Sequence, residues 1–213
     1  FIINGTLKDL SSPFTLKDIN IAVDRLYLAM QNHEVIGLET DHDCDGQTSH
    51  AIFHEALTKV FNYPKDKIRS YIGHRLNEGY GLSELLVNRI LADTVCPSLI
   101  ITADNGSTDE ARIKTLKEHG IDTIVTDHHG LPPEGRPNSA VAVINPSQID
   151  CDYTDKSIAG CMVAWLLMAA LRRKFILNAD VISKTYGLKE LFDFVAIGTV
   201  ADCVSMADSH NNR

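Results

Sequence analysis

Three carboxylates at alternate positions form the densest cluster of charge in this sequence. Asp41, Asp43 and Asp45 follow the apolar run 35–38 and precede a helix-like segment that begins at Gln47. Three such charges on one turn repel one another strongly at pH 7 unless a cation lies among them. The turn therefore predicts a metal site.

The same turn is also compatible with the start of an EF-hand calcium loop, Asp-x-Asp-x-Asp-Gly, with Gly46 at the sixth position. The bidentate acid expected at the twelfth position is here Ile52, and the preceding run 35–38 is strand-like where an incoming helix would be needed. The calcium-loop interpretation is therefore the weaker alternative.

Further polar groups come directly after other apolar segments: Asp104 and Asn105 after 99–103, Asp127, His128 and His129 after 122–126, and Asp202 after an apolar helical segment. Adjacent histidines in a strand or turn point in opposite directions. We therefore expect one of the two to bind metal and the other to face substrate. The turn at Asp104 offers backbone N–H groups to an anion, although Asp and Asn also make ordinary turns. Asp202 taken alone is equally compatible with a solvated helix end.

The residue types favour hydrolysis of a phosphoester. Carboxylates with one or two histidines and no thiolate cluster favour Mn²⁺ or Mg²⁺ over structural zinc. Two such ions that share a carboxylate can activate water and stabilise the charge that develops on phosphorus. Arg75, in the polar loop 74–81, matches the geometry of phosphate oxygens, although a surface arginine is nearly as compatible with its position.

The elements that must position these groups alternate between short apolar runs and amphipathic helical segments. We expect strands at 35–39, 68–72, 99–103, 122–126 and 140–144, and helices at 19–30, 47–61, 83–91, 111–119, 159–175, 178–186 and 188–199. This alternation predicts an α/β fold with a parallel, doubly wound sheet flanked by helices, a helical lead-in within 1–34 and a helical C-terminal portion. Ligands of such sheets bind beyond the carboxyl ends of the strands. The polar residues at those ends therefore predict one shared site.

Composition sets outer bounds. The chain has 213 residues, 44% of them hydrophobic and 23% charged, which suits one domain with a sizeable core. Its formal net charge of -8 argues weakly against a general nucleic-acid binder, and bound cations would neutralise part of that charge. The five cysteines contain no CxxC pair, so we expect free thiols and a cytoplasmic protein. No apolar run reaches eighteen residues, so no membrane span is expected.

Several segments resemble one known family. Asp127-His128-His129 resembles the motif that names the DHH phosphoesterase superfamily, and the segments 41–46, 103–106 and 198–202 resemble its other motifs in the same order. The segment 75–82, Arg-Leu-Asn-Glu-Gly-Tyr-Gly-Leu, is similar to a motif of the RecJ branch, the single-strand-specific 5′→3′ exonucleases. Segments 144–146 and 158–161 resemble that branch too. The likeness extends from about residue 35 to residue 206.

The resemblance implies a fold, an activity and a set of ligands. The expected activity is two-metal hydrolysis of single-stranded DNA from the 5′ end, with Mn²⁺ or Mg²⁺ as cofactor, single-stranded DNA as partner and no membrane association. The expected metal ligands are Asp43, Asp45, Asp104, His128 and Asp202. Among them Asp43 and Asp45 would bind separate ions, Asp104 would bridge them, and His128 and Asp202 would complete the second site.

The resemblance also implies roles for groups around the ions. The expected catalytic residues are Asp41, Asp127 and His129, with His129 facing the scissile phosphate. The expected substrate contacts are Arg75, Asn105 and His129. Glu39 stands where some members of the superfamily have a histidine, and it is either a ligand or a strand-end acid.

Two alternatives to the exonuclease stay open. One is a DHH phosphodiesterase that acts on short oligonucleotides or cyclic dinucleotides, and the other is an inactive replication scaffold. The scaffold is disfavoured because all five expected ligands are present. We expect residues 1–213 to form the catalytic domain, and the second substrate-binding lobe and barrel domain of RecJ-like enzymes to lie outside this chain.

Overall fold

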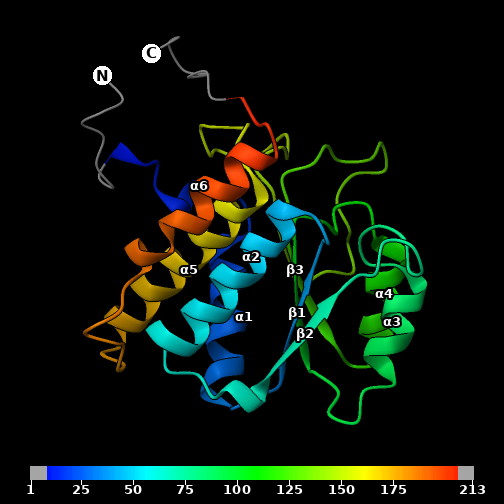
Figure 1. The fold of residues 1–213 in the computed structure, drawn as a ribbon, viewed down its shortest axis with the longest axis horizontal. Helices are drawn as coiled ribbons and strands as arrows, with labels where there is room; N and C mark the ends of the chain where they lie inside the picture. The colour runs from blue at the N-terminus through cyan, green and yellow to red at the C-terminus, as the bar shows by residue number, and fades with distance from the viewer. Residues whose placement is uncertain (1–8, 206–213) are drawn as a thin grey trace.

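Five short segments rich in Ile and Val form one parallel sheet in the computed structural model, which describes residues 9–205 (Figure 1). The strands are β1 (Ile36–Thr40), β2 (Ile68–Ile72), β3 (Leu99–Ala103), β4 (Asp122–Thr126) and β5 (Ala142–Ile144). Every residue of β1 and β3 is buried, as expected for central strands of a parallel sheet that is covered on both faces. The parallel sheet confirms the predicted fold class.

The strand order is β2-β1-β3-β4-β5, so the chain reverses its direction of travel across the sheet between β1 and β3. Thr40 is in register with Ala103, Ala103 with Thr126, and Thr126 with Ile144. The carboxyl ends of these four strands are therefore level. In open parallel sheets, ligands bind beyond the carboxyl ends of the strands at the point where the strand order reverses.

Helices cover both faces of the sheet (Figure 1). One face carries α1 (Ile19–Gln31), α2 (Cys44–Glu55), α5 (Gly160–Leu177) and α6 (Phe192–Ala201), and the other carries α3 (Glu84–Leu91) and α4 (Glu110–Glu118). Alternation along the strands divides the core in two. Leu99 and Ile101 pack with the helices of the first face, whereas Ile100 packs with those of the second. The sheet is therefore doubly wound, as predicted.

The apolar composition of α5 has a structural cause. This helix packs against α1, α2 and α6, and buries side chains from Cys161 to Phe175 on most of its circumference. Among the described residues, no helix combines the length and the apolar character that crossing a membrane would require.

Most elements lie where the sequence predicts them, but α2 starts earlier. It begins at Cys44 instead of Gln47, because the side chain of Asp43 caps it and accepts a hydrogen bond from the Gly46 N–H at 3.0 Å. The acidic turn is therefore also the first turn of a helix. A π-helical turn, η4 (Ala56–Val60), continues α2 before the chain turns towards β2.

The helix predicted at 178–186 is not formed. Ala179 adopts a φ of 58°, in the left-handed region, and this ends α5. The following segment is irregular, and the Ser183 N–H donates to the carbonyl of Val60 at 2.8 Å. The last predicted helix is divided into a 3-10 turn, η6 (Leu188–Leu191), and α6. Two further 3-10 turns are η3 (Pro13–Thr15) and η5 (Lys65–Lys67).

Candidate metal centre

The acidic turn places its three carboxylates in different surroundings. Asp41 follows β1 and is half-buried, Asp43 is exposed at the start of α2, and Asp45 is buried in its first turn. Asp45 is 1% exposed, and its two oxygens accept hydrogen bonds from the backbone N–H groups of Gly160 and Cys161 at 2.6 and 2.9 Å. The N-terminus of α5 therefore holds this carboxylate in one orientation.

Two glycines allow the helices to approach Asp45 this closely. A Cβ at Gly160 would lie 3.0 Å from Oδ2 of Asp45 and 2.9 Å from Cβ of Asp104. A Cβ at Gly198, on α6, would lie 2.8 Å from Oδ1 of Asp45 and 2.6 Å from Sγ of Cys161. Side chains at either position would push α5 or α6 away from the acidic turn.

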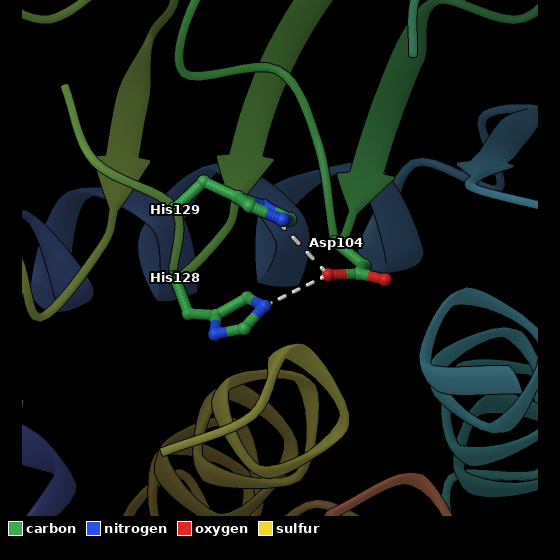
Figure 2. A group of neighbouring side chains, drawn as sticks. All are labelled: Asp104, His128 and His129. Carbon is green, nitrogen blue, oxygen red and sulfur yellow. Dashed lines mark ion pairs between the residues drawn. The ribbon is translucent and has the colours of Figure 1, made fainter. Parts of the chain in front are cut away.

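Asp104 occupies the centre of the site. It follows β3 with a φ of 63°, a left-handed conformation that Asp adopts more readily than most residues. Its Oδ1 atom lies 3.1 Å from Nε2 of His128 and 3.9 Å from Nδ1 of His129 (Figure 2). The ring centroids of the two histidines are only 4.5 Å apart. The expectation that adjacent histidines point in opposite directions is therefore wrong here, because both lie in the loop beyond the end of β4.

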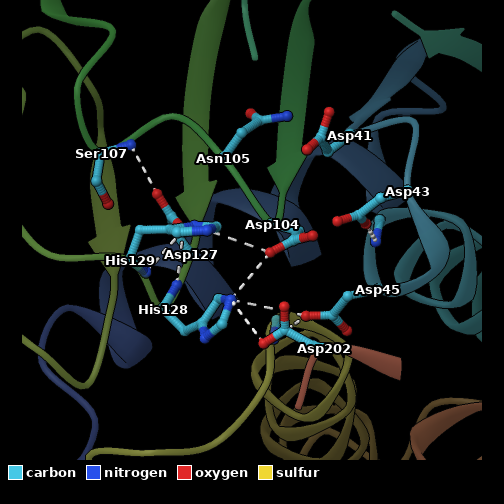
Figure 3. Close-up of polar contacts among 12 residues, drawn as sticks. Asp41, Asp43, Asp45, Asp104, Asn105, Ser107, Asp127, His128, His129 and Asp202 are labelled. Carbon is cyan, nitrogen blue, oxygen red and sulfur yellow. Dashed lines mark hydrogen bonds and ion pairs between the residues drawn. The ribbon is translucent and has the colours of Figure 1, made fainter. Parts of the chain in front are cut away.

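Three overlapping groups of side chains offer three ligand atoms each within 4.8 Å of one another, and one of them is Asp104, His128 and His129 (Figure 2). The other two are Asp41, Asp43 and Asp104, here named the Asp43 site, and Asp45, His128 and Asp202, here named the His128 site. Nε2 of His128 lies 3.6 Å from Asp202 and 3.7 Å from Asp45 (Figure 3). Asp104 belongs to the Asp43 site and lies against His128, so its carboxylate is shared between the two sites.

The residues of both sites fit divalent cations. Oδ1 of Asp104 and Nε2 of His128 are buried, and their 3.1 Å contact is not aligned as a hydrogen bond, so neither atom has a hydrogen-bond partner within residues 9–205. Burial raises the pKa of Asp104, the charges of Asp45 and Asp43 raise it further, and it reaches about 7 despite the opposing effect of His128. Burial and the same two carboxylates also raise the pKa of Asp202. Bound cations would relieve this repulsion.

Asp127 supports the histidine loop from inside. It is buried and accepts hydrogen bonds from the backbone N–H groups of His128 and His129 at 2.7 and 3.1 Å, and from that of Ser107 at 3.0 Å. It also contacts Nδ1 of His129 at 2.8 Å (Figure 3). Burial alone would raise the pKa of Asp127, but these contacts lower it below its usual value. The contact with Asp127 in turn raises the pKa of His129 to about 9.

Arg75 lies in the loop after β2. Its guanidinium lies over the ring of Tyr80, 4.6 Å from the centroid, and donates a hydrogen bond to the Tyr80 hydroxyl. The Tyr80 ring lies 5.5 Å from that of His42, whose Nδ1 atom is 2.7 Å from Oδ1 of Asp41. A series of side-chain contacts through Tyr80 and His42 therefore connects Arg75 to the acidic turn.

Asn105 and Glu39 lie behind the two sites. The Asn105 amide donates to Oε1 of Glu39 at 3.2 Å, and both side chains are buried. Burial and the charge of Asp109 raise the pKa of Glu39 well above its usual value. Glu39 belongs to neither metal site, so its position is that of a buried strand residue. A direct contact between Asn105 and substrate stays a prediction.

The sequence did not reveal the backbone donors of the site. Gly160, Cys161 and Ser107 hold the carboxylates of Asp45 and Asp127 through main-chain N–H groups, which every residue type except proline carries. The sequence does place Gly160 at the start of a long apolar helix. That position does not indicate that its N–H group contacts Asp45.

Comparisons with known proteins show which family this sequence is similar to. The chain is 37% identical over 212 residues to the single-stranded-DNA-specific exonuclease RecJ of Haemophilus influenzae, a match that covers 99% of the chain and 35% of that protein. It is 38% identical over 202 residues to the enzyme of the same name from Escherichia coli, covering 93% of the chain and 33% of that protein. The chain thus spans about a third of the length of these curated relatives.

A solved structure shares the fold. The crystal structure of an exonuclease RecJ bound to manganese superimposes with a TM-score of 0.73 at 31% identity, over 89% of this chain and 44% of that one. The profile described as the DHH family, N-terminal domain, matches residues 35–199. This range begins next to β1 and includes every residue of the two sites except Asp202. Because the match extends over most of the sequence, the chain belongs to the DHH family.

Proposed function

We propose that this chain is the catalytic domain of a metal-dependent exonuclease that hydrolyses single-stranded DNA in the 5′→3′ direction and releases mononucleotides. The observation that carries the proposal is the shared carboxylate of Asp104, which belongs to the Asp43 site and contacts His128 of the second site. The names of the two RecJ relatives support single-stranded DNA as the substrate.

The proposed cofactor is a pair of divalent cations, Mn²⁺ or Mg²⁺. The two sites together offer several carboxylate oxygens and the imidazole of His128, and these ions accept such ligands. The RecJ structure of similar fold is bound to manganese. The Asp43 site would hold one ion and the His128 site the other, with Asp104 between them. When bound, such a pair supplies Lewis-acid activation of water and stabilises charge on the phosphate.

His129 is proposed to act on the scissile phosphate. Its side chain is 57% exposed, and its Nδ1 atom is held by Asp127, which leaves Nε2 free to face the substrate. The raised pKa of about 9 keeps the imidazole protonated at neutral pH. A protonated His129 can donate a hydrogen bond to a phosphate oxygen or a proton to the leaving oxygen. Asp127 then has a positioning role.

Arg75 is proposed to bind a phosphate of the DNA backbone. Its exposed guanidinium is oriented by Tyr80, so little conformational freedom is lost when it contacts an anion. The contacts from Arg75 through Tyr80 and His42 extend from the loop after β2 to Asp41, and a single strand could follow them towards the proposed ions.

The proposed compartment is the cytoplasm. The five cysteines are all free, which suits a reducing environment. The two named relatives are bacterial proteins. In a bacterial cell the DNA lies in the cytoplasm, so an enzyme that acts on it must be there too.

The proposal is tested with the protein expressed from its complete gene. 5′- and 3′-labelled single strands, duplex DNA, a dinucleotide and a cyclic dinucleotide are incubated with Mn²⁺. We expect labelled mononucleotides to be released early from 5′-labelled single strands and late from 3′-labelled ones. Duplex DNA should not be cleaved. Cleavage of the dinucleotide or cyclic dinucleotide alone would replace the proposal with a phosphodiesterase of small substrates. Metal binding without cleavage of any substrate would favour a scaffold.

A further inference from the structure

The turn that follows β5 is hydrogen-bonded to the loop that carries the two histidines. Asn145 is fully buried, and its Nδ2 atom donates to the carbonyl of His129 and to Oγ of Ser107, each at 2.9 Å. Oγ of Ser147 donates to the carbonyl of His128 at 3.0 Å. The Ser147 N–H donates to Oδ1 of Asn145 at 2.8 Å. The amide of Asn145 is therefore itself locked in the orientation that makes these contacts.

Every backbone polar group of the histidine pair has a partner as a result. The N–H groups of His128 and His129 donate to Asp127, and their carbonyls accept from Ser147 and Asn145. A loop beyond a strand end usually retains freedom in its backbone, because it lacks the hydrogen bonds of a sheet. Here the loop backbone is held from both sides, and this fixes the point from which each imidazole extends.

The two metal sites depend on this loop unequally. The His128 site takes one of its three ligand groups from the loop, whereas the Asp43 site takes none. A change that releases the loop would therefore displace His128 and leave the acidic turn and its cap in place.

We propose that Asn145, assisted by Ser147, is a positioning residue that sets the affinity of the His128 site for its cation and not that of the Asp43 site. The inference rests on the proposed two-metal centre. Asn145 lies in the turn after β5 and belongs to neither group of ligands. The inference therefore assigns metal affinity at one site in part to a residue that is not a ligand. Partners behind a metal ligand typically contribute about 10–100-fold to metal affinity when removed.

The test is Asn145→Asp, which keeps the size of the side chain but places a carboxylate oxygen against the carbonyl of His129. Mn²⁺ alone is titrated into the metal-free protein, with free Mn²⁺ followed by electron paramagnetic resonance. We expect one of two ions to bind about 10–100-fold more weakly and the other to keep its affinity. Asn88→Asp, the same change at an exposed position on α3, should bind both ions as the wild type does.

Double variants identify the ion that is lost. Asp202→Asn weakens the His128 site directly, so adding Asn145→Asp to it should change Mn²⁺ binding little. Adding Asn145→Asp to Asp43→Asn should weaken both ions, because the two changes then act on different sites. Equal weakening of both ions in the single variant, or wild-type binding of both, would overturn the inference.

A failure of the variant to fold, or of the proposed activity, can be distinguished from a failure of this inference. Far-UV circular dichroism and cooperative unfolding report whether Asn145→Asp folds. If it does not, Ser147→Ala decides, because it removes only the hydrogen bond to His128: selective weakening of one ion supports the proposal, and unchanged binding overturns it. If the wild type binds no Mn²⁺, the proposed metal centre itself fails. Since no DNA is present, a wrong choice of substrate leaves the measurement intact.

Discussion

The backbone N–H of Gly160 donates to the carboxylate of Asp45 at 2.6 Å, across 115 residues of sequence. This hydrogen bond joins the start of α5 to the first turn of α2 at the metal centre. The position of Asp45, a proposed ligand, therefore depends on how α2 and α5 pack. If Asp45 moved, it would lose its hydrogen bonds to the N-terminus of α5.

Gly160→Ala should therefore damage the centre without removing a ligand. The added Cβ would lie 2.9 Å from Cβ of Asp104 and 3.0 Å from Oδ2 of Asp45. The N–H of Asp104 donates to the carbonyl of Thr126, and the carboxylate of Asp45 accepts from the start of α5, so both residues are held in place. We expect Mn²⁺ affinity to fall at least about tenfold and the free energy of unfolding to fall by about 1–3 kcal/mol. Metal titration and urea unfolding measure the two effects. Gly73→Ala is the control, since no atom lies within 4 Å of its added Cβ. Wild-type Mn²⁺ binding by Gly160→Ala would contradict the argument.

Asp104→Asn should weaken both ions, whereas Asp202→Asn should weaken one. The reason is that Asp104 belongs to the Asp43 site and contacts His128, while Asp202 belongs only to the His128 site. We expect turnover to fall by at least about a thousandfold in Asp104→Asn, because several kcal/mol of charge stabilisation depend on the ions. Calorimetric titration with Mn²⁺ gives the number and affinity of ions in each variant. A single weakened ion in Asp104→Asn would exclude a bridging role.

Asp127→Asn should lower the pKa of His129. The contact with Asp127 is the largest cause of the raised value of about 9, and an amide cannot supply its charge. We expect the pKa to move towards 6.5, the value of an unperturbed imidazole. Nuclear magnetic resonance of the imidazole signals, recorded against pH in the presence of a chelator, follows the titration. His119, an exposed histidine on the far end of α4, provides the internal control. An unshifted His129 titration would remove Asp127 as the cause.

Glu34→Gln should destabilise the fold in a pH-dependent manner. Burial acts to raise the pKa of Glu34, but hydrogen bonds from Ser98 at 2.6 Å and Arg25 at 2.8 Å outweigh it, and the folded-state pKa lies below 4.5. A carboxylate with a lowered pKa stabilises the fold above its unfolded pKa, and this contribution disappears as pH falls through the folded value. Glu34 thus ties α1 to the start of β3 most strongly at neutral pH.

The expected loss in Glu34→Gln is about 1–2 kcal/mol of unfolding free energy at pH 7. It should shrink towards zero as the pH falls through the lowered folded-state pKa of Glu34, because the wild-type carboxylate then becomes protonated itself. Urea unfolding of both proteins over a series of pH values from 7 downwards measures the difference. A loss of the same size at every pH would assign the effect to packing.

Local patterns were sufficient to predict the sheet. The strands at 68–72, 99–103 and 122–126 have the predicted bounds, because each is a short apolar run between turn residues and is buried by neighbours of the same kind. The helix at 178–186 was wrong, because its weak apolar periodicity is overridden by the left-handed Ala179 and by the hydrogen bond from Ser183 to Val60.

The site was predictable only as far as the strand ends. Parallel strands bring their carboxyl ends together, so the sequence alone could place Asp41, Asp104 and His128 at one edge. The residues that hold those groups, such as Gly160 and Asn145, act through contacts between segments distant in sequence. Such contacts produce no periodic pattern in the sequence. They depend on how α2, α5 and the turn after β5 pack together.

The two glycines beside Asp45 also constrain how this fold can diverge. Gly160 and Gly198 leave no room for a side chain while α5 and α6 lie against Asp45, a proposed metal ligand. A descendant that no longer needed cations could let both helices move outwards and fill the gap with larger residues. The size of the residues at these two positions should therefore distinguish relatives under selection for metal binding from those released from it, even before any ligand is lost.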